Sequence, residues 1–372
     1  MDHATTITWF ALGVLTKRRY DMLLKRFGNL ADALAELNET VLQELGCKPE
    51  TITQTLQRKE KLQPTASASG GLRGPGIEEY AERLERAGIA MINIEDDLYP
   101  AMLKEIGDPP VFLSYRGDLS LLTRPCLGIV GSRNMSSYGK RVVESWVPEI
   151  AGNGVVTVSG LALGIDAAVA SSTIAAGGKT VAVLGHGLAR MYPPSNAGLA
   201  REIIEKGGLL LSEFPLDIAP DRYTFPARNR IIAGLSRGVL VIEAGAESGA
   251  LITADLSIDY GREAFAVPGS IFSELSAGCH TILSRGEAKI ALSAREVLQD
   301  IRVLPMTQCT QCASPPEDST ERRIWEQLTG VPQSISDLVE SCRLDTSCIG
   351  ATLTTLEIAG RARSVDGMWV RG

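Results

Sequence analysis

Residues 225–255, FPARNRIIAGLSRGVLVIEAGAESGALITAD, decide the fold because a helix, a buried strand and a second helix follow one another directly. Pro226 suits the first turn of a helix over about 226–236, on which Arg228 and Arg230 would lie. The apolar run that follows predicts a buried strand, and a patch of Gly, Ala and Ser leads into the next helix. Positive charge is therefore concentrated beside a surface almost bare of side chains, which suits a phosphate backbone.

The same alternation of strand and helix fills the centre of the chain. Buried strands are predicted at 126–130, 154–160, 180–185, 209–213, 238–244 and 263–269. Helices are predicted between them at about 138–151, 164–176, 196–206, 226–236 and 249–260. Continuous apolar strands separated by helices predict a parallel sheet covered on both faces, which is an α/β fold. Residues 77–125, with the helix IEEYAERLERAG, are expected to extend this domain.

Composition shifts divide the chain into five predicted segments. They are a helical domain (1–63), a small-residue linker (64–76), an extended Rossmann-like α/β domain (77–302), a polar linker (303–318) and a terminal domain (319–372). The terminal domain combines three predicted helices with a hairpin turn at Asp366-Gly367, which is the outline of a winged helix. Its six basic and seven acidic residues leave protein contact as plausible as DNA contact.

The totals limit the function classes. The 372-residue chain is 44% hydrophobic and carries a formal net charge of −7, which argues against a protein coated in positive charge, such as a histone-like DNA packager. Seven scattered cysteines fit a reducing cytoplasm better than a disulfide scaffold. The apolar run ITWFALGVL is short and precedes its basic cluster, so neither a signal peptide nor a membrane span is expected. The expected location is cytoplasmic.

Small residues follow every predicted strand, and this convergence is the main signal for a binding site. In an open parallel sheet, ligands bind outside the carboxyl ends of the strands, where bare backbone amides make sites for anions. The residues expected to line such a pocket are Gly131, Ser132, Ser159, Gly160, Ser248 and Gly249. Residues 131–141 add Arg133, Lys140 and Arg141 without any acid, a local charge of +3. The alternative is an ordinary strand-to-helix turn with a solvated arginine.

Residues 221–237 hold four arginines and one aspartate, again a local charge of +3. Phe225 stands just before Arg228, Asn229 and Arg230. A cation, an aromatic ring and bare backbone together are typical of single-strand binding, because charge follows the phosphates while rings stack on bases. The alternative makes Phe225 a core residue and pairs the arginines with carboxylates such as Glu213 or Glu243.

Metal and cofactor sites are not expected. The chain has three histidines, and His186 has no metal-binding partner nearby in the sequence. The glycines around His186 lack the spacing of a dinucleotide fingerprint, and the Cys pair CTQC, 309–312, has no second pair to complete a zinc site. No catalytic triad stands out, although Glu243 at a strand end is a candidate if hydrolysis occurs. Asp166 is expected to stabilise a helix start.

These residues together resemble the DNA-processing protein A family (DprA, also called Smf) of bacterial natural transformation. Seven motifs occur in order between about residues 90 and 290: GIVGSRNMSSYG, VVTVSGLALGIDAAV, YPPSN, LLLSEFP, FPARNRIIAGLS, VIEAGAESGALITA and AVPGS. The flanks are similar too, with an N-terminal region like a sterile-alpha or helix-hairpin-helix domain and a C-terminal winged helix. His186 and His280 stand where the family more often has a small or polar residue and asparagine, respectively.

The resemblance implies a non-enzymatic protein whose Rossmann-like domain dimerises and binds single-stranded DNA in a basic pocket. It implies protection of incoming strands and loading of RecA recombinase onto them, past single-strand-binding protein. By motif, Arg133, Arg228 and Arg230 would contact DNA, with Lys140 and Phe225 as further candidates.

Two other functions stay open from the sequence. One is a nucleotide-processing hydrolase related to phosphoribohydrolases, although their Pro-Gly-Gly-x-Gly-Thr-x-x-Glu turn is missing here. The other is an adaptor whose terminal domains recruit partners.

Overall fold

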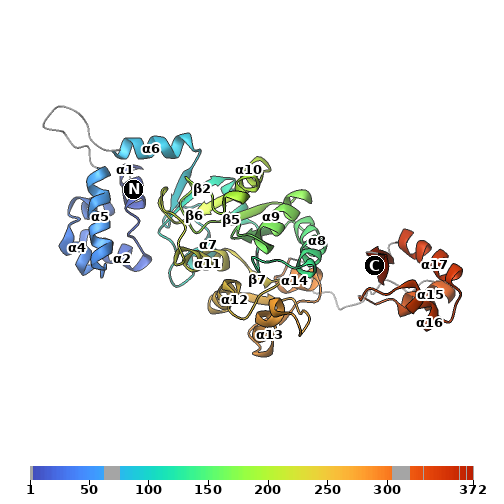
Figure 1. The fold of residues 1–372 in the computed structure, drawn as a ribbon. Helices are drawn as coiled ribbons and strands as arrows, with labels where there is room; N and C mark the ends of the chain where they lie inside the picture. The colour runs from blue at the N-terminus through green and yellow to red at the C-terminus, as the bar shows by residue number, and fades with distance from the viewer. Residues whose placement is uncertain are drawn as a thin grey trace. The chain divides into compact units, whose positions relative to one another are not determined.

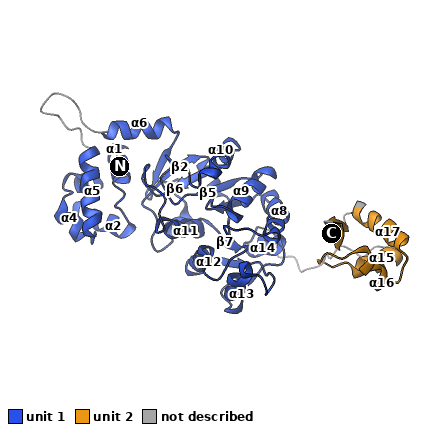
Figure 2. Ribbon diagram, in the orientation of Figure 1, with its two compact units in different colours: residues 1–306 blue, residues 307–372 orange. Residues whose placement is uncertain are grey.

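The computed structural model describes residues 3–62, 76–303, 319–329, 331–359, 361–365 and 367–371. The chain divides into two compact units, residues 1–306 and 307–372 (Figure 2). Nearly all of the two predicted linkers, and the CTQC pair with them, lie outside the described residues. No helix in the described ranges is both long enough and apolar enough to cross a membrane.

A nine-stranded sheet forms the centre of the first unit, in the order β1-β2-β6-β5-β4-β3-β7-β8-β9. Figure 1 labels β2, β5, β6 and β7 among the helices that surround them. The six predicted strands are confirmed as β3 (Cys126–Val130), β4 (Val156–Ser159), β5 (Thr180–Val183), β6 (Leu209–Ser212), β7 (Gly238–Val241) and β8 (Glu263–Ala266). All six run parallel to their neighbours within this set. The predicted α/β class and parallel core are therefore correct.

Beyond these six parallel strands, the sheet has an antiparallel edge whose strands were not predicted. Strands β1 (Ala90–Asn93) and β2 (Phe112–Gly117) join the sheet antiparallel, with β2 against β6. Both belong to the segment that was expected to extend the domain. A short strand, β9 (Lys289–Ile290), lies parallel to β8 at the other edge. β1 and β2 each include exposed residues and β9 is exposed, so their sequences lack the mostly apolar run that marks the central strands.

Helices cover both faces of the sheet, as predicted. Alternate side chains of β3 pack on opposite sides: Leu127 and Ile129 against α8 (Ser137–Gly152), α9 (Ile165–Ala175) and α14 (Ala294–Asp300). Cys126 and Val130 belong to the core that contains α11 (Thr224–Leu235) and α12 (Gly249–Asp259). Helix α10 (Ala197–Glu205) follows β5, and α7 (Ala101–Lys104) and α13 (Ala277–Ser284) complete the layers. Because the helices cover the two faces of the sheet, the site lies at the carboxyl ends of the strands.

The N-terminal helices are α1 (His3–Leu12), α2 (Lys17–Phe27), α3 (Leu30–Ala35), α4 (Glu39–Glu44) and α5 (Pro49–Leu62), followed by α6 (Ile77–Arg86). Their apolar side chains form one core with those of the sheet domain. Tyr80 of α6 accepts a hydrogen bond from the Leu216 amide at 2.9 Å, and Arg83 pairs with Asp217. The predicted boundary at residue 63 stays a prediction, because the helices and the sheet pack as one unit.

The second unit contains α15 (Ser319–Gln327), α16 (Ile335–Cys342) and α17 (Thr346–Ile358), with β10 (Ala362–Val365) and β11 (Met368–Arg371). The strands pair antiparallel, with Val365 opposite Met368, and Gly367 has a φ of +78° in the turn. Asp366 of the predicted turn is outside the described residues. Leu338 and Leu353 lie in its apolar core. Three helices and a hairpin confirm the winged-helix prediction.

Candidate nucleic-acid interface

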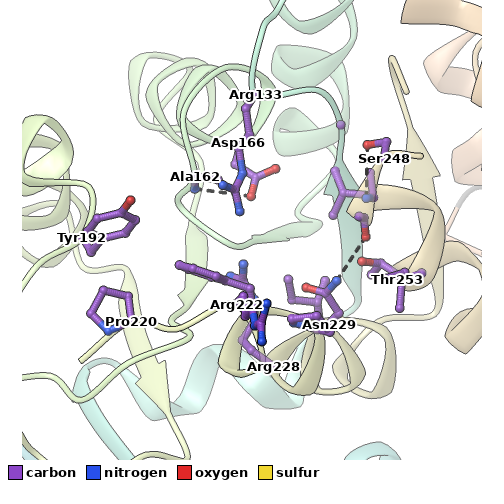
Figure 3. A pocket seen from close by; sticks show the side chains of 18 of the residues that line it. Arg133, Ala162, Asp166, Tyr192, Pro220, Arg222, Arg228, Asn229, Ser248 and Thr253 are labelled. Carbon is purple, nitrogen blue, oxygen red and sulfur yellow. Dashed lines mark hydrogen bonds between the residues drawn. The ribbon is translucent and has the colours of Figure 1, made fainter. Parts of the chain in front are cut away.

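A cavity of about 640 Å³ opens at the carboxyl ends of β3 to β7 (Figure 3). Five successive loops contribute to its wall, as expected for the edge of a parallel sheet. The lining residues are Val130, Gly131, Arg133, Ala162, Asp166, Tyr192, Pro220, Asp221, Arg222, Phe225, Pro226, Arg228, Asn229, Ile232, Ser248, Gly249, Ala250, Ile252 and Thr253. Three arginines and two aspartates are among them, so these lining side chains carry a net charge of +1.

The structure brings most of the predicted site residues to this cavity. Those that line it are Gly131, Arg133, Phe225, Arg228, Asn229, Ser248 and Gly249. Ser132, Ser159 and Gly160 lie behind the wall. Ser132 is buried and shapes the loop that carries Arg133, since its Oγ accepts a hydrogen bond from the Asn134 amide at 3.0 Å. Asn229 donates its side-chain amide to the Gly249 carbonyl at 3.2 Å, which joins α11 to the start of α12.

Arg228 is a buried cation in the cavity wall. Its side chain projects from the first turns of α11 and is only 5% exposed, and Nη1 donates to the Val183 carbonyl. Its Nε has no hydrogen-bond partner within the part of the chain that the structure describes. Burial lowers the pKa of Arg228 to about 10, so the guanidinium stays protonated at neutral pH. A buried charge with unused donors beside a cavity is suited to hold an anion.

Gly160 makes room for Arg228. A Cβ atom built on Gly160 would overlap the guanidinium group, so a side chain here would displace it. Ser159, just before, ends β4 and is fully buried. Gly160 therefore acts by allowing the guanidinium to lie against the backbone, whereas the Ser159 hydroxyl donates to the Asp166 carbonyl at 3.5 Å.

Asp166 lies in the first turn of α9, as predicted, and its carboxylate also lines the cavity. Oδ2 accepts hydrogen bonds from the amides of Gly160, at 3.0 Å, and Ala162, at 3.4 Å. Burial raises the pKa of Asp166, and the nearby charge of Arg228 opposes that rise. A place in the cavity wall was not expected for Asp166, because helix-start aspartates usually point at their own helix.

Aromatic rings and arginines lie together at the rim. The Arg133 guanidinium carbon is 5.2 Å from the centroid of the Phe225 ring, and the Tyr192 and Phe225 centroids are 6.0 Å apart. Arg222 covers the Tyr223 ring at 4.7 Å. Phe225 thus lines the cavity and is not a core residue. Tyr192 and Arg222 were not predicted as site residues, although the YPPSN motif and the four-arginine cluster contain them.

Arg230 and Lys140 do not line the cavity. The Arg230 side chain is 15% exposed and forms ion pairs with Glu213 at 2.5 Å and Asp108 at 3.7 Å. The sequence left open that the arginines pair with carboxylates such as Glu213 instead of facing a ligand. Arg230 has this alternative arrangement in the structure. An α-helix turns about 100° per residue, so positions 228 and 230 point about 200° apart and cannot face one cavity. Lys140 is exposed on α8, 3.7 Å from Glu144.

Glu243, the candidate for hydrolysis, is buried and engaged in holding the start of α8. Its carboxylate accepts hydrogen bonds from the Ser136 amide, at 3.0 Å, and from the Ser136 hydroxyl. His280 contacts the Gly269 backbone through Nε2. Within the described residues, no three His, Cys, Asp or Glu side chains are grouped to hold a metal ion. The cavity wall therefore combines arginines, aromatic rings and backbone with the two aspartates Asp166 and Asp221.

Comparison with known protein families follows the same division of the chain. The model of DNA recombination-mediator protein A matches residues 90–302, and that of the DprA winged helix domain matches residues 310–368. The chain belongs to the DNA recombination-mediator protein A family. The resemblance predicted from the seven motifs is thereby confirmed.

Individual members of this DprA family support the assignment. DNA processing protein DprA of Streptococcus pneumoniae is 47% identical over 208 residues, which are 56% of this chain and 73% of that protein. The X-ray structure of DprA from the same species has a TM-score of 0.64 and 36% identity, covering 80% of this chain and 98% of that one. The structure of DNA processing protein A from Helicobacter pylori is described for its single-stranded DNA binding mode. It has a TM-score of 0.52 and 30% identity, and it covers 57% of this chain and 94% of that one.

Proposed function

We propose that this chain binds single-stranded DNA in the cavity at the carboxyl edge of its sheet. The observation that carries the proposal is Arg228, whose buried guanidinium lines the cavity and whose Nε has no hydrogen-bond partner among the described residues. A phosphate group supplies the acceptor oxygens and the negative charge that this guanidinium lacks. Family membership and the single-stranded DNA binding of the Helicobacter pylori relative support the same conclusion.

The rim of the cavity favours a single strand over a duplex as the ligand. Phe225 and Tyr192 line the cavity, and bases can stack on such rings only if the bases are unpaired. Stacking on an aromatic side chain contributes about 1–3 kcal/mol per base. The cavity, at about 640 Å³, has the size of pockets that hold drug-sized molecules, so it admits parts of one strand and not a double helix. Arg133 and Arg222 at the rim would contact neighbouring phosphates.

Replacing Arg133 with Ala is expected to weaken binding of an oligothymidylate about tenfold, the effect of one hydrogen bond to a charged group. It should also reduce the slope of log affinity against log salt by about 0.7, the amount for one lost phosphate contact on a single strand. Fluorescence anisotropy at several salt concentrations measures both quantities. Arg201→Ala, an exposed position on α10, is the matched control and should bind as wild type. Equal affinities for all three proteins would remove Arg133 from the interface.

We further propose that the chain protects incoming strands and loads RecA recombinase onto them past single-strand-binding protein, as a homodimer and without catalysing a reaction. For the homodimer, the edge of the sheet domain offers support, because Ile290 of β9 and Leu292, just after it, are 54% and 61% exposed. Ile290→Glu should convert the dimer to monomer in analytical ultracentrifugation. A wild-type protein that sediments as a monomer would contradict the homodimer.

RecA loading is tested separately, by the rate of filament assembly on strands coated with single-strand-binding protein. The full chain should accelerate assembly, and Arg228→Ala should not. If both proteins accelerated filament assembly equally, RecA loading would not depend on the cavity. If neither accelerated it, the proposed loading would be refuted.

A further inference from the structure

A carboxylate in a cavity that binds a polyanion needs an explanation. Asp166 is 5% exposed and lines the same wall as Arg228 and Arg133. Its charge repels phosphate and offsets one of the three lining arginines. If the cavity held only the sugar–phosphate backbone, this carboxylate would weaken binding. Its presence therefore points to a second kind of ligand group beside the phosphate.

The two oxygens of Asp166 are used differently. Oδ2 receives both backbone amides, those of Gly160 and Ala162, whereas Oδ1 receives no hydrogen bond from any described residue. The charges of Arg228 and Arg133 act on the Asp166 carboxylate from a distance. No cation of the described residues lies within 4.0 Å of this carboxylate, as an ion pair would require. Figure 3 shows the dashed bond from Ala162 on one side of the carboxylate, with the labelled Arg133 beside it.

The backbone that holds Asp166 is fixed in place. Leu161, between the two donating amides, is fully buried with a φ of +53°, a conformation that few non-glycine residues adopt. Asn196 donates its side-chain amide to the carbonyls of Leu161, at 3.0 Å, and Ala162, at 3.3 Å. This bracing keeps the free oxygen in one position before any ligand arrives, as a recognition group requires.

We propose that Oδ1 of Asp166 accepts a hydrogen bond from a ring or exocyclic N–H group of a nucleobase. The inference rests on the proposed binding of single strands in this cavity. An unpaired base presents such donors on its Watson–Crick edge, where thymine, for example, has its N3–H. The cavity then holds a base edge on Asp166 and a phosphate on Arg228, so binding depends on the base as well as on charge.

The test compares two oligothymidylates on the full chain, one unmodified and one with a methyl group on N3 of every thymine. Methylation removes the N–H donor and keeps the phosphates and the ring face. Wild-type protein should bind the methylated strand about tenfold more weakly, the effect of a hydrogen bond to a charged acceptor. This measurement needs no variant, so it stands even if a substitution at 166 disturbs folding.

Asp166→Asn then assigns the effect to this side chain. The Asn oxygen can still accept from Gly160 and Ala162, while its NH₂ group replaces the free acceptor. The variant should bind both strands with nearly equal affinity, so the tenfold ratio falls to about one. Asp221→Asn is the matched control, since Asp221 is the other lining carboxylate and is exposed, and it should keep the wild-type ratio.

The ratio is the decisive quantity, because loss of a negative charge strengthens binding of any strand. If Asp166 served only as a counter-charge for Arg228, Asp166→Asn would change both affinities by one factor and leave the ratio intact, which would overturn the inference. A wild-type ratio of one would overturn it as well. Failure of the proposed function looks different, because then neither strand binds.

Discussion

Arg228→Ala is expected to weaken binding of single-stranded DNA about thirtyfold while leaving the protein folded. A hydrogen bond between charged groups contributes about 2 kcal/mol, which corresponds to this factor. Removing Arg228 loses its hydrogen bond to the Val183 carbonyl, but it also removes a buried charge, and the second effect offsets the first, so the variant should stay folded. Anisotropy titration measures the affinity, and urea denaturation of the full chain measures the free energy of unfolding.

Gly160→Ala provides an independent route to the same loss. The added methyl group would displace the Arg228 guanidinium, so affinity should fall although no charge is removed. The double variant should bind no more weakly than Arg228→Ala, because both changes remove one contact. Gly198→Ala, where a Cβ meets nothing within 4 Å, is the matched control. Additive losses in the double variant, or wild-type affinity for Arg228→Ala, would exclude Arg228 as the phosphate ligand.

Arg230→Ala should have the opposite profile, because Arg230 supports the fold. It would leave Glu213 as a buried carboxylate without its partner, which destabilises by about 3 kcal/mol. Affinity for single strands, measured at a temperature where the variant is folded, should stay within about twofold of wild type, the spread expected for a position with no ligand contact. A thirtyfold loss of affinity with unchanged stability would show that Arg230 faces the ligand.

The stability loss of Arg230→Ala should depend on pH in a stated direction. Burial already raises the pKa of Glu213 above its ordinary value, and Arg230 opposes that rise. Without Arg230, the folded-state pKa rises further, while the unfolded value does not change. Folding then favours the protonated form, so stability is lost as pH increases between the two pKa values. In urea denaturation, Arg230→Ala should therefore lose less free energy of unfolding at pH 5 than at pH 8. A larger loss at pH 5 would contradict the pairing of Arg230 with Glu213.

The central fold was predictable because parallel strands are buried on both faces. Each of the six runs from 126–130 to 263–269 is mostly apolar, and the structure has a strand in every one. β1 and β2 were not predictable in the same way, since both include exposed residues and β2 takes its partner β6 from a distant part of the chain. Their antiparallel direction depends on how residues 94–111 return the chain.

The position of the candidate site also followed from pattern, because parallel strands bring their carboxyl ends to one edge. Gly131, Arg133, Phe225, Arg228, Asn229, Ser248 and Gly249 were expected there and line the cavity. The alternation of residue types along the chain thus determined the α/β class, the edge that holds the site and the family motifs on it.

Tertiary packing decided what each polar side chain does at that edge. Arg228 and Arg230 look equivalent in the chain, yet one lines the cavity and the other pairs with Glu213 and Asp108. Asp166 looks like a helix-start residue, yet it presents a carboxylate to the same space. Charge and polarity are local properties of a residue, whereas its partners come from segments far away in the chain, and only the folded backbone sets the distances between them.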